Sequence, residues 1–186
     1  QMSHVNGNKW ERSIPEVLLI DGVIEEVSQI HHVLEKSSEN KSSMVIVCRN
    51  ASKEVKKTIS LNYIRGTVDA ILVEIGFSPE IHHFFEDMSA LFGCSFVNLQ
   101  MGDTISSKIE KLIFTLDLVK IDTTSITFLK DQKDKKYIND YISDVRDIKS
   151  KFDQTSDPES YEAISEIVDN RLRFLSSRMA EINVGK

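Results

Sequence analysis

Glycines, cysteines and long apolar runs are scarce in this 186-residue sequence, and each scarcity excludes a class of protein. Its seven glycines are scattered singly, and neither G-x-x-x-x-G-K-[ST] nor G-x-G-x-x-G occurs, so no loop that cradles nucleotide phosphates is predicted. The G-x-S-x-G turn of serine hydrolases is missing as well. We therefore expect no catalytic residue and no enzyme activity.

The two cysteines, Cys48 and Cys94, belong to no C-x-x-C motif. Two free, mostly buried thiols in a reducing compartment are favoured over a disulfide or a metal pair. No apolar run approaches the roughly 20 residues that cross a membrane as a helix. The first twelve residues are polar, unlike a signal peptide. We therefore expect a cytoplasmic protein without membrane contact.

The net charge and the positions of the histidines argue against nucleic acid and metal ions as ligands. The formal net charge of -6 disfavours nucleic acid, because sequence-independent binding needs a basic face. The pairs His31-His32 and His82-His83 cannot chelate alone, because adjacent helical residues point about 100° apart. No metal site is therefore predicted. The acid pair at residues 86–87 is expected on a solvated helix face.

Apolar periodicity predicts alternating strands and helices. The predicted strands cover residues 17–20, 44–48, 68–75, 95–99, 114–121, 125–129 and 179–184, and the predicted helices 24–36, 52–65, 78–92, 137–152 and 158–175. Loops are predicted at 39–43 and 131–136, whereas 105–112 is ambiguous. Asp21-Gly22 is expected to be a turn, and residues 1–15 an arm carrying Trp10, separate from a single domain at 16–186. These elements predict a layered α/β domain with a C-terminal helix hairpin.

The helix at 52–65 has the clearest boundaries. Ser52 is a candidate N-cap, and Arg65-Gly66 supplies a cation and a left-handed cap at the other end. The next helix starts at Ser78-Pro79-Glu80 and closes at Gly93.

These same residues carry a resemblance to a known family. The segments N-Y-I-R-G at 62–66, G-F at 76–77 and E-D-M-S-A-L-F-G at 86–93 occur in the order and spacing found in the apical domain of group I (GroEL-type) chaperonins. Residues 17–20 and 33–35 upstream, and 121–124 and 170–185 downstream, extend the similarity over about 16–185. The sequence thus resembles a divergent chaperonin apical domain.

The resemblance implies a swivelling β/β/α domain that binds non-native polypeptides, and a co-chaperonin loop as a further candidate partner, between two parallel helices. The family's binding positions fall on His31, Leu34, Lys56, Ser60, Leu61, Asn62 and Ile64. Only Leu34, Leu61 and Ile64 among them are clearly apolar, so these positions offer less apolar area than those of the family. Leu34 could equally be a core residue, because it continues the spacing of Val27 and Ile30; the core alternative is weaker for Leu61.

The resemblance also implies a parent protein about three times longer, a homo-oligomeric ring that uses ATP and Mg²⁺ bound outside these residues. This chain alone is expected to be a monomer without a cofactor. Two family features are missing: an aromatic segment has no match in 1–15, and the paired hinge glycines fall on Ser177-Arg178. A non-enzymatic interaction or scaffolding module of the same fold is the alternative. A small-molecule enzyme of unrecognised type is a weaker one.

Overall fold

Residues 9–105, 109–122, 125–130, 136–152, 158–176 and 179–183 are described by the computed structural model. Within them, one sheet has four parallel strands in the order β4-β3-β2-β5, and the short β6 (Phe114–Thr115) pairs antiparallel with β2. Its parallel strands are β2 (Glu16–Ile24), β3 (Ser43–Ala51), β4 (Asp69–Glu74) and β5 (Val97–Asn98). A second, antiparallel sheet has the order β1-β7-β8-β9. Its strands are β1 (Lys9–Ser13), β7 (Leu118–Asp122), β8 (Ser125–Leu129) and β9 (Met179–Asn183).

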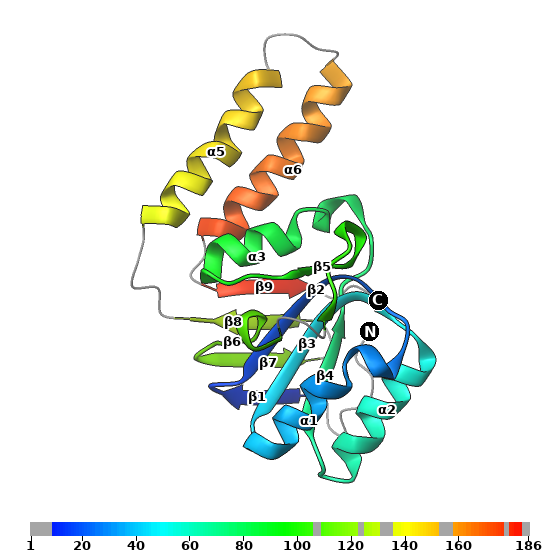
Figure 1. The fold of residues 1–186 in the computed structure, drawn as a ribbon. Coiled ribbons are helices and arrows are strands. Elements are labelled where there is room, and N and C mark those ends of the chain that lie inside the picture. The colour runs from blue at the N-terminus through cyan, green and yellow to red at the C-terminus, as the bar shows by residue number, and fades with distance from the viewer. Residues whose placement is uncertain are drawn as a thin grey trace.

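Helices cover both faces of the parallel sheet (Figure 1). The helix α1 (His31–Asn40), preceded by the 3-10 turn η1 (Val27–Gln29), and α2 (Lys53–Ile64) lie on one face. The opposite face packs against α3 (Phe84–Phe92) and the antiparallel sheet. Two long helices, α5 (Lys136–Phe152) and α6 (Pro158–Ser176), pack side by side and extend away from α3. The remaining elements are η2 (Pro79–Ile81), η3 (Leu99–Met101) and α4 (Ile109–Leu112).

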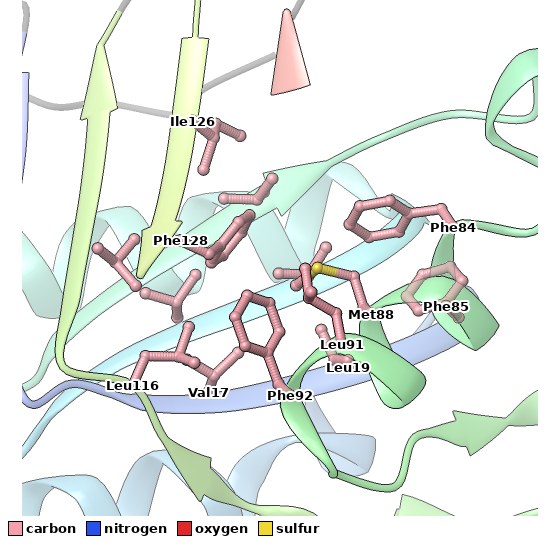
Figure 2. Packing of buried hydrophobic residues seen from close by; sticks show 14 of the residues in the cluster. Val17, Leu19, Phe84, Phe85, Met88, Leu91, Phe92, Leu116, Ile126 and Phe128 are labelled. Carbon is pink, nitrogen blue, oxygen red and sulfur yellow. The ribbon is translucent and has the colours of Figure 1, made fainter. Parts of the chain in front are cut away.

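The central strands are apolar at nearly every position because both faces of the sheet are covered. Successive side chains of a strand point to opposite faces, so β2 and β3 supply two separate cores. Leu18, Ile20 and Ile46 pack under α1 and α2, whereas Val17 and Leu19 pack toward α3. In Figure 2, Met88, Leu91 and Phe92 of α3 gather near Val17 and Leu19 of β2 and near Phe128 of β8, and Phe84 and Phe85 lie farther to the right.

The predicted α/β class is confirmed, and so are several boundaries. The Ser52 hydroxyl accepts a hydrogen bond from the Val55 amide, as an N-cap does. Gly66 and Gly93 have φ values of 68° and 61°, the left-handed conformation expected after a helix. The helices predicted at 137–152 and 158–175 correspond to α5 and α6, and a strand occurs at 179–183.

The arm prediction is wrong for residues 9–13, which form β1 and pair with β7. Trp10 is only 1% exposed and belongs to the core, because it faces inward from this strand. Residues 1–8 lie outside the described part.

The turn predicted at Asp21-Gly22 is also wrong. The strand β2 continues through both residues, with an irregularity in its register between Ile20 and Val23. Gly22 serves a close approach: a Cβ atom there would lie 2.7 Å from the Cβ of Leu99, closer than packed atoms tolerate. The predicted helix at 24–36 consequently starts later, as η1 and then α1.

Other boundaries shift. The predicted helix at 78–92 is split into η2 and α3, the strand at 95–99 shortens to β5, and α1 extends into the predicted loop at 39–43. The ambiguous segment at 105–112 includes α4. The loop predicted at 131–136 lies outside the described residues except for Lys136, which begins α5.

Candidate functional site

The helices α1 and α2 run parallel, as the chain connections require. Each leads from one strand of the parallel sheet to its neighbour, β2 to β3 and β3 to β4, so both helices run opposite to the strands. At one end the Ser52 amide donates to the Ile24 carbonyl. At the other end the Ser38 hydroxyl of α1 donates to the Thr67 carbonyl after α2, at 3.0 Å. The Ser38 bond therefore links the C-terminal ends of α1 and α2, whereas the Ser52 bond fixes the N-terminal end of α2 to β2.

On α2, Val55 and Ile59 face the sheet and are buried. Leu61 follows Ile59 by two residues, about 200° around the helix, and is 39% exposed. Ile64 is 63% exposed. The structure thus places two of the predicted binding residues, Leu61 and Ile64, on the outward side of α2.

Two predicted binding residues are corrected to buried positions. Leu34 is 6% exposed and packs with Val33 and Ile30 under α1, which is the core alternative that its spacing left open. Ser60 is 6% exposed as well. Neither side chain offers surface to a partner in this conformation.

Two others are engaged within the chain. Lys56 Nζ lies 2.7 Å from Glu74 Oε1, at the end of β4. Asn62 donates from Nδ2 to the Thr58 carbonyl at 2.9 Å, and its Oδ1 accepts from the Thr67 hydroxyl at 2.9 Å. Lys56 and Asn62 therefore stabilise the position of α2, and their polar groups are already engaged within the chain.

His31, the remaining predicted residue, is exposed at the start of α1. We define the α1–α2 surface as the exposed side chains His31, His32, Glu35, Ser38 and Glu39 of α1 with Lys53, Glu54, Lys57, Leu61, Ile64 and the following Arg65. Its apolar part consists of Leu61 and Ile64. With Leu34 buried, this surface has less apolar area than the resemblance implies, and charged side chains surround that area.

Sequence reasoning missed a buried polar cluster on the other side of the molecule. Asp87 of α3 is 3% exposed, not solvated as predicted for this acid pair. Arg171 of α6 donates from Nε to Asp87 Oδ2 at 3.0 Å and from Nη2 to Oδ1 at 2.8 Å. The Tyr141 hydroxyl of α5 also donates to Asp87 Oδ1, at 3.0 Å. The only signal in the sequence was the position of Asp87 amid the apolar face of α3.

The sequence analysis also did not predict a buried arginine that forms hydrogen bonds near the ends of the parallel strands. Arg49 of β3 is buried, and its Nε donates to Asp21 Oδ1 of β2 at 2.7 Å. Its other nitrogens donate to the carbonyls of Ile81 and His82, at 3.0 and 2.9 Å. The guanidinium is therefore engaged within the chain, with β2 and with the segment that follows β4.

The remaining reactive groups form no site in the described part. Among those residues, no group of three or more His, Cys, Asp or Glu side chains could hold a metal ion, and no helix is long and apolar enough to cross a membrane. Cys48 and Cys94 are free. Burial raises the pKa of each thiol to about 12, so both stay protonated and unreactive near neutral pH.

No family model matches this chain. Among solved structures it is similar to the chaperonin gp146 from bacteriophage EL 2 (Pseudomonas aeruginosa), determined in the presence of ATP-BeFx. That match has a TM-score of 0.61 at 13% sequence identity and covers 94% of this chain. The chain spans 34% of the chaperonin's length, about a third. The likeness shows a chaperonin-like fold over nearly all of the chain.

Proposed function

We propose that this chain is the polypeptide-binding domain of a divergent chaperonin, and that non-native segments bind to the α1–α2 surface. The observation that carries the proposal is the outward placement of Leu61 and Ile64 on a helix held parallel to α1. The chaperonin-like fold supports it. Apolar contact suits clients that share no sequence, because hydrophobic burial needs no fixed register.

The wider assignments follow from the same proposal. The parent would be a cytoplasmic homo-oligomeric ring, and a co-chaperonin would compete for this surface. ATP and Mg²⁺ would bind elsewhere in the parent, and this chain would bind segments without turnover. A swivelling apical layering, with α5 and α6 as its hairpin, is the matching structural proposal.

One observation favours a second candidate. Leu61 and Ile64 are the only large apolar side chains exposed on α1 and α2 in the described part, and Leu34 and Ser60 are buried. A scaffolding module with the same fold and no client binding would show this reduced apolar surface too.

Replacing Leu61 with Ser separates the two candidates. The free energy of unfolding should fall by about 1–2 kcal/mol, because Leu61 is only 39% exposed and loses its partial burial. Binding of a denatured client should weaken by about 0.6–1.2 kcal/mol, because a client can bury only the 39% of Leu61 that is still exposed. Urea midpoints and fluorescence titration with the denatured client measure the two quantities.

Two control variants fix the interpretation. Ile59→Ser should destabilise the fold by about 2–5 kcal/mol, because Ile59 is buried between α2 and the parallel sheet. Met101→Ser removes an exposed apolar side chain on η3, outside the α1–α2 surface, and should leave binding unchanged. Equal client binding by the wild-type chain and folded Leu61→Ser would refute the proposed surface and leave the scaffolding module.

A further inference from the structure

Cations recur along the outward side of α2 at a regular spacing. Lys53, Lys57, Leu61 and Arg65 follow one another every fourth residue, so Leu61 has a cation one turn before it and another one turn after it. All four side chains are exposed. Within the described part, no ion pair occupies Lys53, Lys57 or Arg65.

This local charge is opposite to that of the whole chain. Residues 53–65 contain four cations and one acid, Glu54, whereas the chain carries a formal net charge of -6. Lys56, the fourth cation, is held by Glu74. On α1, Glu35 and Glu39 are exposed, and Glu35 has His32 as a neighbour, with Oε2 3.9 Å from the ring nitrogen Nδ1. The positive charge is therefore concentrated on α2, around its apolar pair.

We infer that the α1–α2 surface selects acidic apolar segments, in which carboxylates flank a short apolar run. The inference rests on the proposed function and names its preferred clients. The apolar run contacts Leu61 and Ile64, and the flanking carboxylates reach Lys57 and Arg65. Those two cations are about 12 Å apart along the helix axis, at 1.5 Å per residue. An extended peptide covers that span in about four residues, so two or three apolar residues lie between the carboxylates.

Peptide binding to the intact chain tests the inference. Three fluorescently labelled peptides share the core Leu-Val-Leu and differ in the residue on each side of it: Asp, Ser or Lys. The Asp-flanked peptide should bind about five- to tenfold more tightly than the Lys-flanked one in low salt, the effect of two exposed ion pairs. Added salt should reduce that ratio, because exposed charges are screened.

A charge-reversed variant locates the effect. The double variant Lys57→Glu/Arg65→Glu should invert the order of the Asp- and Lys-flanked peptides. Lys9→Glu/Arg146→Glu changes the net charge equally at exposed positions on β1 and α5, and should preserve the original order. Inversion by both double variants would overturn the inference, because net charge alone would then explain the preference.

Two further outcomes distinguish this inference from the proposed function. Equal binding of all three peptides, weakened by Leu61→Ser, would overturn the charge preference and leave the apolar binding surface in place. Binding of none of the peptides, together with no binding of a denatured client, would remove the proposed function and the inference with it.

Discussion

The indole of Trp10 is buried in the same cluster as Val119 and Ile121 of β7. The Arg12 guanidinium lies 5.1 Å from the centre of the indole ring, so the cation also covers its face. A residue expected on a free arm therefore contributes to the core between the two sheets. Its burial ties β1 to the domain by packing as well as by the pairing of β1 with β7.

Replacing Trp10 with Ala should lower the free energy of unfolding by about 3–5 kcal/mol, because it leaves a large cavity in the core. Urea denaturation followed by circular dichroism measures the change. The matched variant Met101→Ala removes an exposed apolar side chain and should cost less than about 0.5 kcal/mol. Similar midpoints for the two variants would contradict the placement of Trp10 in the core.

His83 should make the stability of the chain depend on pH. Burial and the nearby Arg171 lower the pKa of His83, and His82 acts in the same direction, against the opposing influence of Glu86 and Asp87. The folded chain therefore favours neutral His83. Its contribution to stability is complete above the ordinary histidine pKa of about 6.5, and it is lost as the pH falls below that value.

Urea midpoints at pH 7.5 and pH 5 for the wild-type chain and His83→Gln measure this effect. The variant should lose less stability between the two values, because glutamine cannot take up a proton. His32→Gln, a change at an exposed position on α1, should keep the wild-type dependence. An unchanged dependence in His83→Gln would show that other groups cause it.

At the scale of elements, α3 is the helix to which α5 and α6 are fastened. Arg171 and Tyr141 converge on Asp87 from these two helices. Burial raises the pKa of Tyr141, and the negative charge of Asp87 raises it further, so the hydroxyl stays protonated and donates. One carboxylate thus joins three helices.

Asp87→Asn should destabilise the chain by about 3–5 kcal/mol, because it leaves the buried guanidinium of Arg171 without its counter-charge. The double variant Asp87→Leu/Arg171→Met should recover most of that loss, since apolar side chains can replace a buried pair. Lys149→Ala removes a more exposed ion pair between α5 and α6 and should cost about 1 kcal/mol or less. Urea denaturation of all three variants would contradict the arrangement if Asp87→Asn cost no more than Lys149→Ala.

Elements with local signals were predictable from the sequence. The cap at Ser52 and the left-handed glycines after α2 and α3 depend only on nearby residues. The apolar spacing of α2 likewise predicted that Leu61 faces outward. The strand β1 and the continuation of β2 past Gly22 depend on distant partners, β7 and Leu99. Burial of Leu34 and Ser60 and the pairing of Lys56 with Glu74 likewise depend on tertiary packing. The residue pattern of one helix alone therefore could not predict these burials or this ion pair.

At the scale of the whole molecule, the two sheets are joined by charge as well as by packing. Arg12 of β1 donates two hydrogen bonds to the Asp69 carboxylate of β4, at 2.7 and 3.1 Å. Burial raises the pKa of Asp69, but the hydrogen bonds from Arg12 and Ser43 outweigh it and the net shift is downward. The edge of the parallel sheet is thereby fixed to the edge of the antiparallel sheet. Described strands of both sheets also share one hydrophobic core, which is consistent with the chaperonin-like fold.

The packing of the two sheets against each other affects the expected oligomeric state of the 186-residue chain. An exchange in which residues near Trp10 insert into a second copy would have to empty the core, so it is disfavoured. Among the described residues, the exposed large apolar side chains are spread over separate segments: Ile14, Val23, Leu61, Ile64, Phe77, Met101 and Tyr137. A stable interface needs about 1,000 Å² with good complementarity, which such scattered residues do not provide.

We therefore expect one copy per particle at micromolar concentration, measured by light scattering after size-exclusion chromatography. Exposed charges on the edge strand β1, Lys9 and Glu11, oppose pairing of that edge with another chain. If dimers do form, Leu61→Ser/Ile64→Ser tests whether the α1–α2 surface joins them. Dimers that dissociate in this variant would show that the proposed client surface binds a second copy. Dimers that persist would show an interface elsewhere, and either result would contradict the expected monomer.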